Sequence, residues 1–116
     1  MAFAYARLAE ITTISDSAAS VYANPSSTTS YVRLIVLHNT NTTAETVILY
    51  NVPDNAAAVG TAADANTFYE KALSPNETIT IELTTPGIVM TDENDTIQAV
   101  TDTASVVTVQ IYGGTE

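Results

Sequence analysis

Regular alternation of apolar and polar side chains is the feature that most restricts how this chain can fold. In residues 77–83, isoleucine or leucine at every second position is separated by threonine or glutamate. A period of two places successive side chains on opposite faces of a β-strand, so that one face is buried and the other meets water. The inward positions of this segment and of the similar segment 105–112 are Ile79, Ile81, Leu83, Val107, Val109 and Ile111.

Short segments of this kind recur along the chain, and none has the 3.6-residue period of a helix. The expected strands are residues 20–23, 30–39, 44–52, 67–73, 77–83, 88–90, 96–101 and 105–112. Seven or eight short strands without crossover helices predict an all-β fold, a single-domain antiparallel β-sandwich of jelly-roll or Ig-like type. We expect residues 11–116 to form the sandwich and residues 1–10 to form an N-terminal arm.

The strongest hydrophobic segment, residues 30–39, predicts a central strand. Apolar residues occur on both of its faces, so we expect both faces to be covered. One face would carry Tyr31, Arg33, Ile35 and Leu37, and the other Val32, Leu34, Val36 and His38.

Residues 53–66 form the longest expected connection between strands. Hairpin loops usually have about 2–5 residues, so a longer connection is a candidate functional protrusion. The alternative interpretation is a slack connection, or one that contains a single turn of helix.

The charge balance is strongly acidic, with 3 Lys+Arg against 13 Asp+Glu and a formal net charge of -10. The basic residues Arg7, Arg33 and Lys71 stand singly, so no basic cluster is available to displace counterions from phosphate. We therefore expect neither nucleic acid nor a membrane among the partners. No segment has the ~18 apolar residues of a membrane span, and the first residues do not resemble a secretory signal.

The sequence lacks the usual motifs of catalytic triads and of zinc sites. The only histidine, His38, has no serine motif around it, and there is no cysteine. These absences exclude the usual catalytic triads and zinc sites. We therefore expect no enzyme activity and assign no catalytic residue, cofactor or metal ligand.

Two clusters keep an alternative open. The acidic turn Asp92-Glu93-Asn94-Asp95 offers oxygen ligands of the kind that hold Ca²⁺, or is a solvated turn that caps the backbone. Tyrosine side chains could form an exposed sugar-binding or protein-binding platform, or could be cross-strand partners within the sheets. The tyrosines concerned are Tyr22, Tyr31, Tyr50, Tyr69 and Tyr112.

The order of the segments resembles a group of small virion proteins of tailed bacteriophages. The resemblance is carried by residues 5–8, 31–39, 73–81, 87–90, 94–99 and 107–113. It is a rhythm of strands and turns that covers most of the chain, and it contains no chemical signature.

The resemblance implies a non-enzymatic virion structural protein, most simply a capsid decoration or cement protein. Such a protein is made in the host cytoplasm, binds the outer face of the major capsid protein lattice and stabilises it, here as a homotrimer. Phe3, Tyr5, Arg7 and Leu8 of the arm would then contact a neighbouring subunit or the capsid.

Two alternatives belong to other classes of protein. The first is a tail or neck accessory module that binds a receptor or a carbohydrate through the tyrosines and residues 53–66. The second is an adhesion domain that depends on calcium at residues 92–95.

Overall fold

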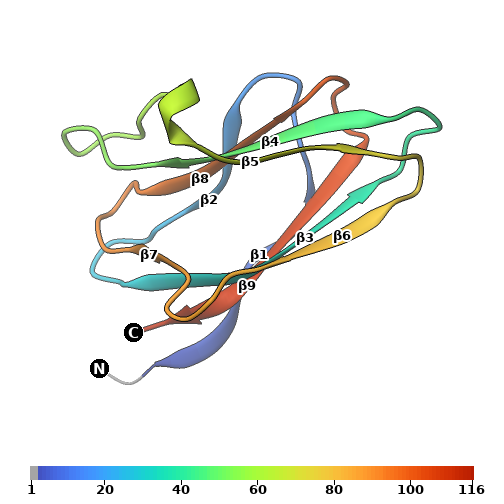
Figure 1. The fold of residues 1–116 in the computed structure, drawn as a ribbon. Coiled ribbons are helices and arrows are strands. Elements are labelled where there is room, and N and C mark those ends of the chain that lie inside the picture. Colours follow the sequence, from blue (N-terminus) through green and yellow to red (C-terminus); the bar gives the residue numbers. More distant parts are fainter. Residues whose placement is uncertain (1–2) are drawn as a thin grey trace.

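The computed structural model describes residues 3–116, which form two antiparallel β-sheets packed face to face (Figure 1). The strands are β1 (Ala4–Thr13), β2 (Ala19–Ala23), β3 (Ser30–Asn39), β4 (Glu45–Val52), β5 (Thr67–Leu73), β6 (Thr78–Glu82), β7 (Ile88–Met90), β8 (Thr96–Thr101) and β9 (Val107–Thr115). The only helical element in residues 3–116 is the 3₁₀ turn η1 (Asp64–Asn66). Within this range, no helix is long and apolar enough to cross a membrane.

The strand pairs are nested one inside the next. β1 pairs with β9, β2 with β8, β3 with β6 and β7, and β4 with β5, all antiparallel. The five-stranded sheet has the order β1-β9-β3-β6 with β7 also beside β3, and the four-stranded sheet has the order β2-β8-β4-β5. A long antiparallel ribbon folded over in this way gives the paired Greek keys of a jelly roll. The expected β-sandwich is confirmed, and its pairing follows the jelly-roll alternative.

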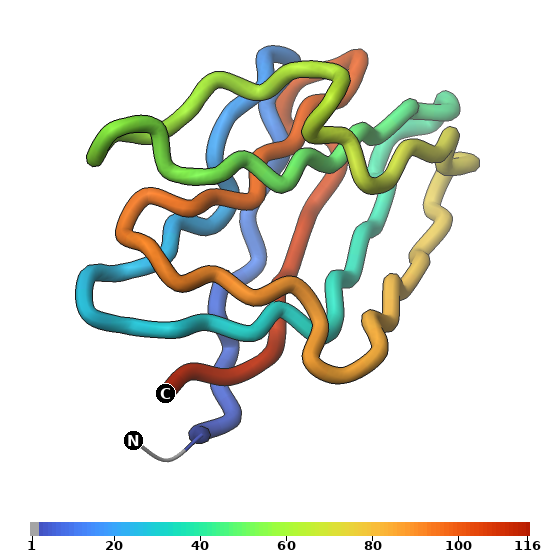
Figure 2. Tube along the Cα trace, turned by 60° about the vertical axis from the view of Figure 1, so that its left-hand side comes forward, coloured from blue at the N-terminus to red at the C-terminus, as the bar shows by residue number. Residues whose placement is uncertain are grey.

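The strand segments expected from the sequence are present, and one further strand lies at the start of the chain. Residues 4–10, expected as part of an arm, lie instead in β1, which continues to Thr13 and pairs with β9. Residues 1–2 of that arm lie outside the described residues. β1 forms an edge of the five-stranded sheet, and Figure 2 shows it running beside the C-terminal strand. The domain therefore includes most of the segment that was expected to precede it.

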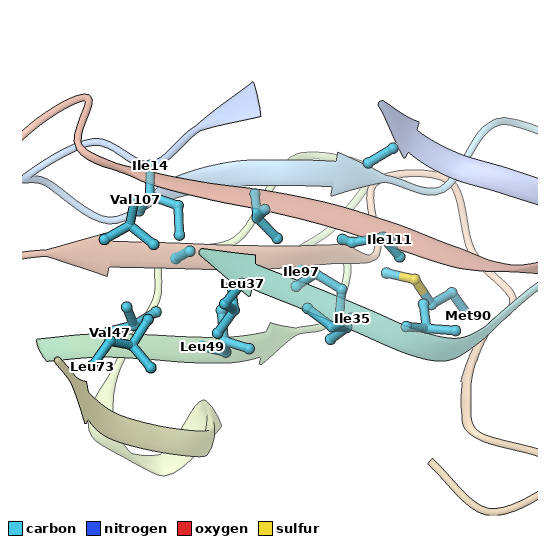
Figure 3. Packing of buried hydrophobic residues seen from close by; sticks show 14 residues of the cluster. Ile14, Ile35, Leu37, Val47, Leu49, Leu73, Met90, Ile97, Val107 and Ile111 are labelled. Carbon is cyan, nitrogen blue, oxygen red and sulfur yellow. The ribbon is translucent and has the colours of Figure 1, made fainter. Parts of the chain in front are cut away.

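The core lies between the two sheets and is built from the alternating apolar positions (Figure 3). Ile79, Ile81 and Leu83 pack against it, as their spacing predicts. The fully or nearly fully buried members are Ala9, Ile14, Val32, Ile35, Leu37, Val47, Leu49, Leu73, Met90, Ile97, Ala99, Val107, Val109 and Ile111. Burial of this apolar surface provides the main force that holds the sheets together.

The expectation that both faces of β3 are covered is wrong. A bulge between Val32 and Leu34 inserts an extra residue and shifts the alternation, so that Val32 joins Ile35 and Leu37 in the core. The outer face of β3 is only partly buried and carries Leu34, Val36 and His38. β3 is central because strands flank it on both sides within its sheet. No third layer of the described chain lies over it.

Candidate functional site

An open hollow lies on the outer face of the five-stranded sheet, across β1, β9 and β3. Its volume is about 470 Å³. Its walls are mostly apolar, and the lining residues are Tyr5, Ala6, Arg7, Arg33, Leu34, Tyr112 and Gly113. Because two arginines line it, we call it the arginine hollow.

Two consecutive glycines lie near the end of β9, and the first of them, Gly113, lines this hollow. A Cβ atom on Gly113 would overlap the backbone oxygen of Tyr31, so β9 and β3 approach here only because the side chain is missing. A Cβ atom on Gly114 would overlap the ring of Phe3. The glycines therefore let the β3 backbone and an aromatic ring approach β9 closely beside the hollow.

Aromatic rings form one rim of the arginine hollow. The ring centre of Phe3 lies 5.1 Å from that of Tyr5 in an edge-to-face arrangement and 5.6 Å from that of Tyr31. The guanidinium carbon of Arg33 lies 4.7 Å from the centre of the Phe3 ring. This cation–π contact holds Arg33 beside the aromatic rim.

The two arginines differ in how their charge is compensated. Arg7 Nη2 donates to Glu10 Oε1 at 2.9 Å, but both side chains are mostly exposed, so the pair contributes little stability. Within residues 3–116, Arg33 forms no ion pair, and its Nε is buried without a hydrogen-bond partner. Arg7 would have to share its charge with Glu10, whereas Arg33 has no ion pair to give up, so Arg33 can gain more than Arg7 from an incoming anion.

Tyr31 lies at the aromatic rim, and its hydroxyl donates to the carboxylate of Glu116. This hydrogen bond, together with burial and the charge of Glu116, raises the pKa of Tyr31, whereas the charge of Arg33 acts in the opposite direction. Tyr31 therefore stays protonated at neutral pH and anchors the end of the chain beside the hollow.

The structure brings three of the four predicted contact residues to one surface. Tyr5 and Arg7 line the arginine hollow, and Phe3 contacts Tyr5 at its rim. Leu8 instead packs against the core. The sequence indicated Tyr112 only as a member of the tyrosine platform and gave no role to Arg33, Leu34 and Gly113. An arginine within the most hydrophobic strand and a glycine pair at a strand end were available as signals.

The proposed platform of five tyrosines is divided among different environments. Tyr50 is buried, and Tyr22 and Tyr69 pack against the core. Tyr112 lines the arginine hollow, and Tyr31 contacts Phe3 at its rim. The exposed aromatic surface thus depends on Phe3 and Tyr5 as much as on these tyrosines.

Residues 53–66 carry a second hollow of about 340 Å³, which we call the loop hollow. It is mainly polar and is lined by Val52, Pro53, Asp54, Asn55, Gly60, Thr61 and Asn66. The loop ends in the single turn η1, and the Gln98 side chain ties it to the sheet by donating to the backbone oxygen of Gly60 at 2.9 Å. Residues 53–66 are therefore a loop that contains one helical turn and is attached to the sheet by a hydrogen bond.

The acidic turn at residues 92–95 supports the same loop. Asp95 accepts hydrogen bonds from the backbone N–H groups of Asp54, Thr91 and Asp92 at 2.7, 3.1 and 3.0 Å. These bonds agree with the backbone-capping interpretation of the turn.

Elsewhere, His38 Nδ1 lies 2.6 Å from the hydroxyl of Thr78 on the outer sheet face. Residues 3–116 contain no group of three or more His, Cys, Asp or Glu side chains placed to hold a metal ion.

Comparison of the chain with protein-family models, curated proteins and solved structures finds no match. Function is therefore inferred below from the fold and the exposed surfaces.

Proposed function

We propose that this protein is a non-enzymatic structural component of a phage virion, most simply a decoration or cement protein on the outer face of the capsid. The proposal takes the major capsid protein as partner and a homotrimer as the assembled form. The resemblance in the order of segments supports the class. Jelly rolls occur in viral capsids, in lectins and in enzymes, so the fold is compatible with this class but does not select it.

The observation that carries the proposal is the exposed apolar surface of the edge strand β1. Tyr5 is 84% exposed and Ile11 is 62% exposed. Only one side of β1 is paired, because β9 is its single neighbour in the sheet. An unpaired strand edge with large apolar side chains favours association with another chain. We propose that a capsid subunit or a neighbouring copy covers this edge.

The net charge of -10 supports a role on the outside of a particle. A strongly acidic surface repels packaged nucleic acid and anionic membranes, so the protein would remain available for protein contacts.

The experiment is thermal dissociation of shells assembled from the major capsid protein of the same phage. Wild-type protein should raise the dissociation temperature, and the double variant Tyr5→Ser/Ile11→Thr should lose that effect. Val59→Thr is the matched control, because it removes an exposed apolar side chain from residues 53–66. An unchanged dissociation temperature with the wild-type protein rejects the proposal. If only Val59→Thr failed to raise the dissociation temperature, the capsid contact would lie at residues 53–66 and not at β1.

A second candidate is a carbohydrate-binding module at the tail or neck, which the aromatic rim of the arginine hollow favours. Tyr5 and Tyr112 line the hollow and carry aromatic rings of the kind on which sugars stack. Binding to a glycan array that is lost in Tyr112→Ala, together with no binding to shells, would select this candidate.

A further inference from the structure

The positive charge of this protein is concentrated at one place. Of its three basic residues, Arg7 and Arg33 both line the arginine hollow, whereas Lys71 is on β5 in the other sheet. The 13 acidic residues make the protein as a whole repel anions. The hollow therefore combines two guanidinium groups with a concave surface, a combination suited to recognising an anion.

Arg33 has unused hydrogen-bonding capacity. Its Nε is buried without a partner in the described chain, and the Phe3 ring holds the guanidinium by a cation–π contact. A carboxylate can accept two parallel N–H bonds from one guanidinium, and Arg33 has no ion pair within the described chain to give up for them. A held guanidinium also loses less conformational freedom on binding than a free one.

The walls of the hollow indicate what the carboxylate is attached to. Leu34 and the rings of Tyr5 and Tyr112 provide mainly apolar contacts. The hydroxyl of Tyr112 already donates to Gln110 Oε1 at 2.6 Å. A sugar would need polar partners for several hydroxyl groups, and apart from the two arginines this lining supplies few. An apolar group that carries a carboxylate fits these walls better.

The free edge of β1 favours a protein segment as the occupant. Tyr5, Ala6 and Arg7 lie both in the wall of the hollow and on the edge strand. An extended segment can pair its backbone with an open strand edge while its alternate side chains occupy neighbouring pockets. Edge and hollow together thus provide backbone pairing and recognition of one acidic side chain.

We infer that the arginine hollow binds the carboxylate of an acidic residue within an extended, otherwise apolar segment of a partner protein. The inference rests on the proposed function, because the capsid subunit would supply this segment. Arg33 and Arg7 hold the carboxylate, and Leu34 and Tyr112 contact the flanking apolar side chains.

The test uses two blocked peptides, acetyl-Thr-Val-Glu-Val-Thr-amide and the same peptide with glutamine in place of glutamate. Each is titrated into ¹⁵N-labelled full-length protein, and the amide shifts are followed by NMR. The glutamate peptide should bind about tenfold or more tightly than the glutamine peptide, as expected when a hydrogen bond to a charged group is lost. The shifts should concentrate at residues 5–7, 33–34 and 112–113.

Two variants and one control locate the binding. Arg33→Gln and Arg7→Gln should each remove most of the preference for glutamate, and Arg7 is exposed enough for its replacement to leave the fold intact. Lys71→Gln is the matched control, because it removes the same charge from the other sheet. The control should retain the preference, with unchanged melting temperatures confirming that the folds are comparable.

Equal affinity for the two peptides, or no shift with either up to about 10 mM, would overturn the inference. An equal loss of preference in Lys71→Gln would overturn it too, because the effect would then reflect net charge alone. If sodium glucuronate bound more tightly than the glutamate peptide, the inference would be overturned, because the ligand of the hollow would then be an acidic sugar and not a protein segment. The shell experiment is independent: peptide recognition without shell stabilisation rejects only the proposed function, and the reverse result rejects only this inference.

Discussion

The arginine hollow and the loop hollow, about 470 and 340 Å³ in volume, differ in how their polar groups are used. In the loop hollow, the Asp54 N–H donates to Asp95, and Gln98 donates to the backbone of Gly60. Each hollow contains one buried atom without a partner within residues 3–116, Arg33 Nε in the arginine hollow and Asp54 Oδ1 in the loop hollow. The other Asp54 oxygen accepts from the Ala57 N–H at 3.1 Å, whereas Arg33 forms no ion pair in this range. The comparison teaches that a hollow filled with internal hydrogen bonds mainly shapes the chain. A hollow lined by a cation without an ion pair is the better candidate for an anionic ligand.

The largest expected effect concerns the glycine in each hollow. Gly113→Ala should lower the free energy of unfolding by about 3 kcal/mol, because the new Cβ would overlap the backbone of β3 in the sheet interior. Gly60→Ala should cost less, about 1.5 kcal/mol, because its Cβ would lie 2.9 Å from the Pro53 backbone oxygen and from Val52 Cγ1, a milder overlap than at Gly113. Urea unfolding at neutral pH measures both. Equal costs would show that the floor of the arginine hollow is no more rigid than the loop.

The next effect tests the structural use of the acidic turn. Asp95→Ala should lower the free energy of unfolding by about 2 kcal/mol, because three backbone N–H groups lose their charged acceptor. Glu93→Ala, an exposed change in the same turn, should remain within about 0.5 kcal/mol of wild type. If the two variants unfold alike, Asp95 is not the support of the loop hollow.

A smaller effect is expected from the charge in the arginine hollow. Arg33→Gln should lower the free energy of unfolding by no more than about 1 kcal/mol, because it loses the contact with Phe3 but no hydrogen bond from Nε. The same urea titration measures this change. A cost as large as that of Asp95→Ala would make Arg33 a structural residue and would remove the contrast between the hollows.

The smallest effect lies at alkaline pH. The raised pKa of Tyr31 means that the folded chain holds this proton more tightly than the unfolded chain. The stabilisation is complete below the unfolded pKa of about 10 and is lost as pH rises through the higher folded value. Tyr31→Phe should therefore flatten the fall in melting temperature above about pH 10. Some of the fall should persist, because burial and the charge of Glu77 also raise the pKa of Tyr69. An unchanged slope would contradict the role of the Glu116 hydrogen bond.

The sequence was sufficient for the strands because period-two patterns report directly on burial. Ile79 and Ile81 face inward in the positions that their spacing predicts, and β3 has the expected bounds. β1 was missed in part because its burial pattern is mostly exposed, so it carries little periodic signal. The bulge at Val32 was missed because the extra residue of a bulge depends on pairing with another strand.

The site was harder to predict because it joins residues that are far apart in the chain. Tyr5 and Arg7 were proposed as contact residues from the N-terminal segment alone. Arg33 and Tyr112 join them only through the register of β1, β9 and β3. No local pattern contains that register. The glycine pair becomes meaningful only once the neighbouring strand and the Phe3 ring are in place.

The nesting of strand pairs also has a kinetic consequence. β4 and β5 close the smallest loop of the ribbon, whereas pairing β1 with β9 joins Ala4 to Thr115 across nearly the entire chain. Closing a longer loop costs more entropy. We therefore expect β4 and β5 to pair first, the next strand pairs to follow outward, and β1 and β9 to pair last. By the same reasoning, amide protons of β1 should exchange before those of β3 and β4. The arginine hollow, with one wall on β1, would then open and close while the remaining sandwich stays folded.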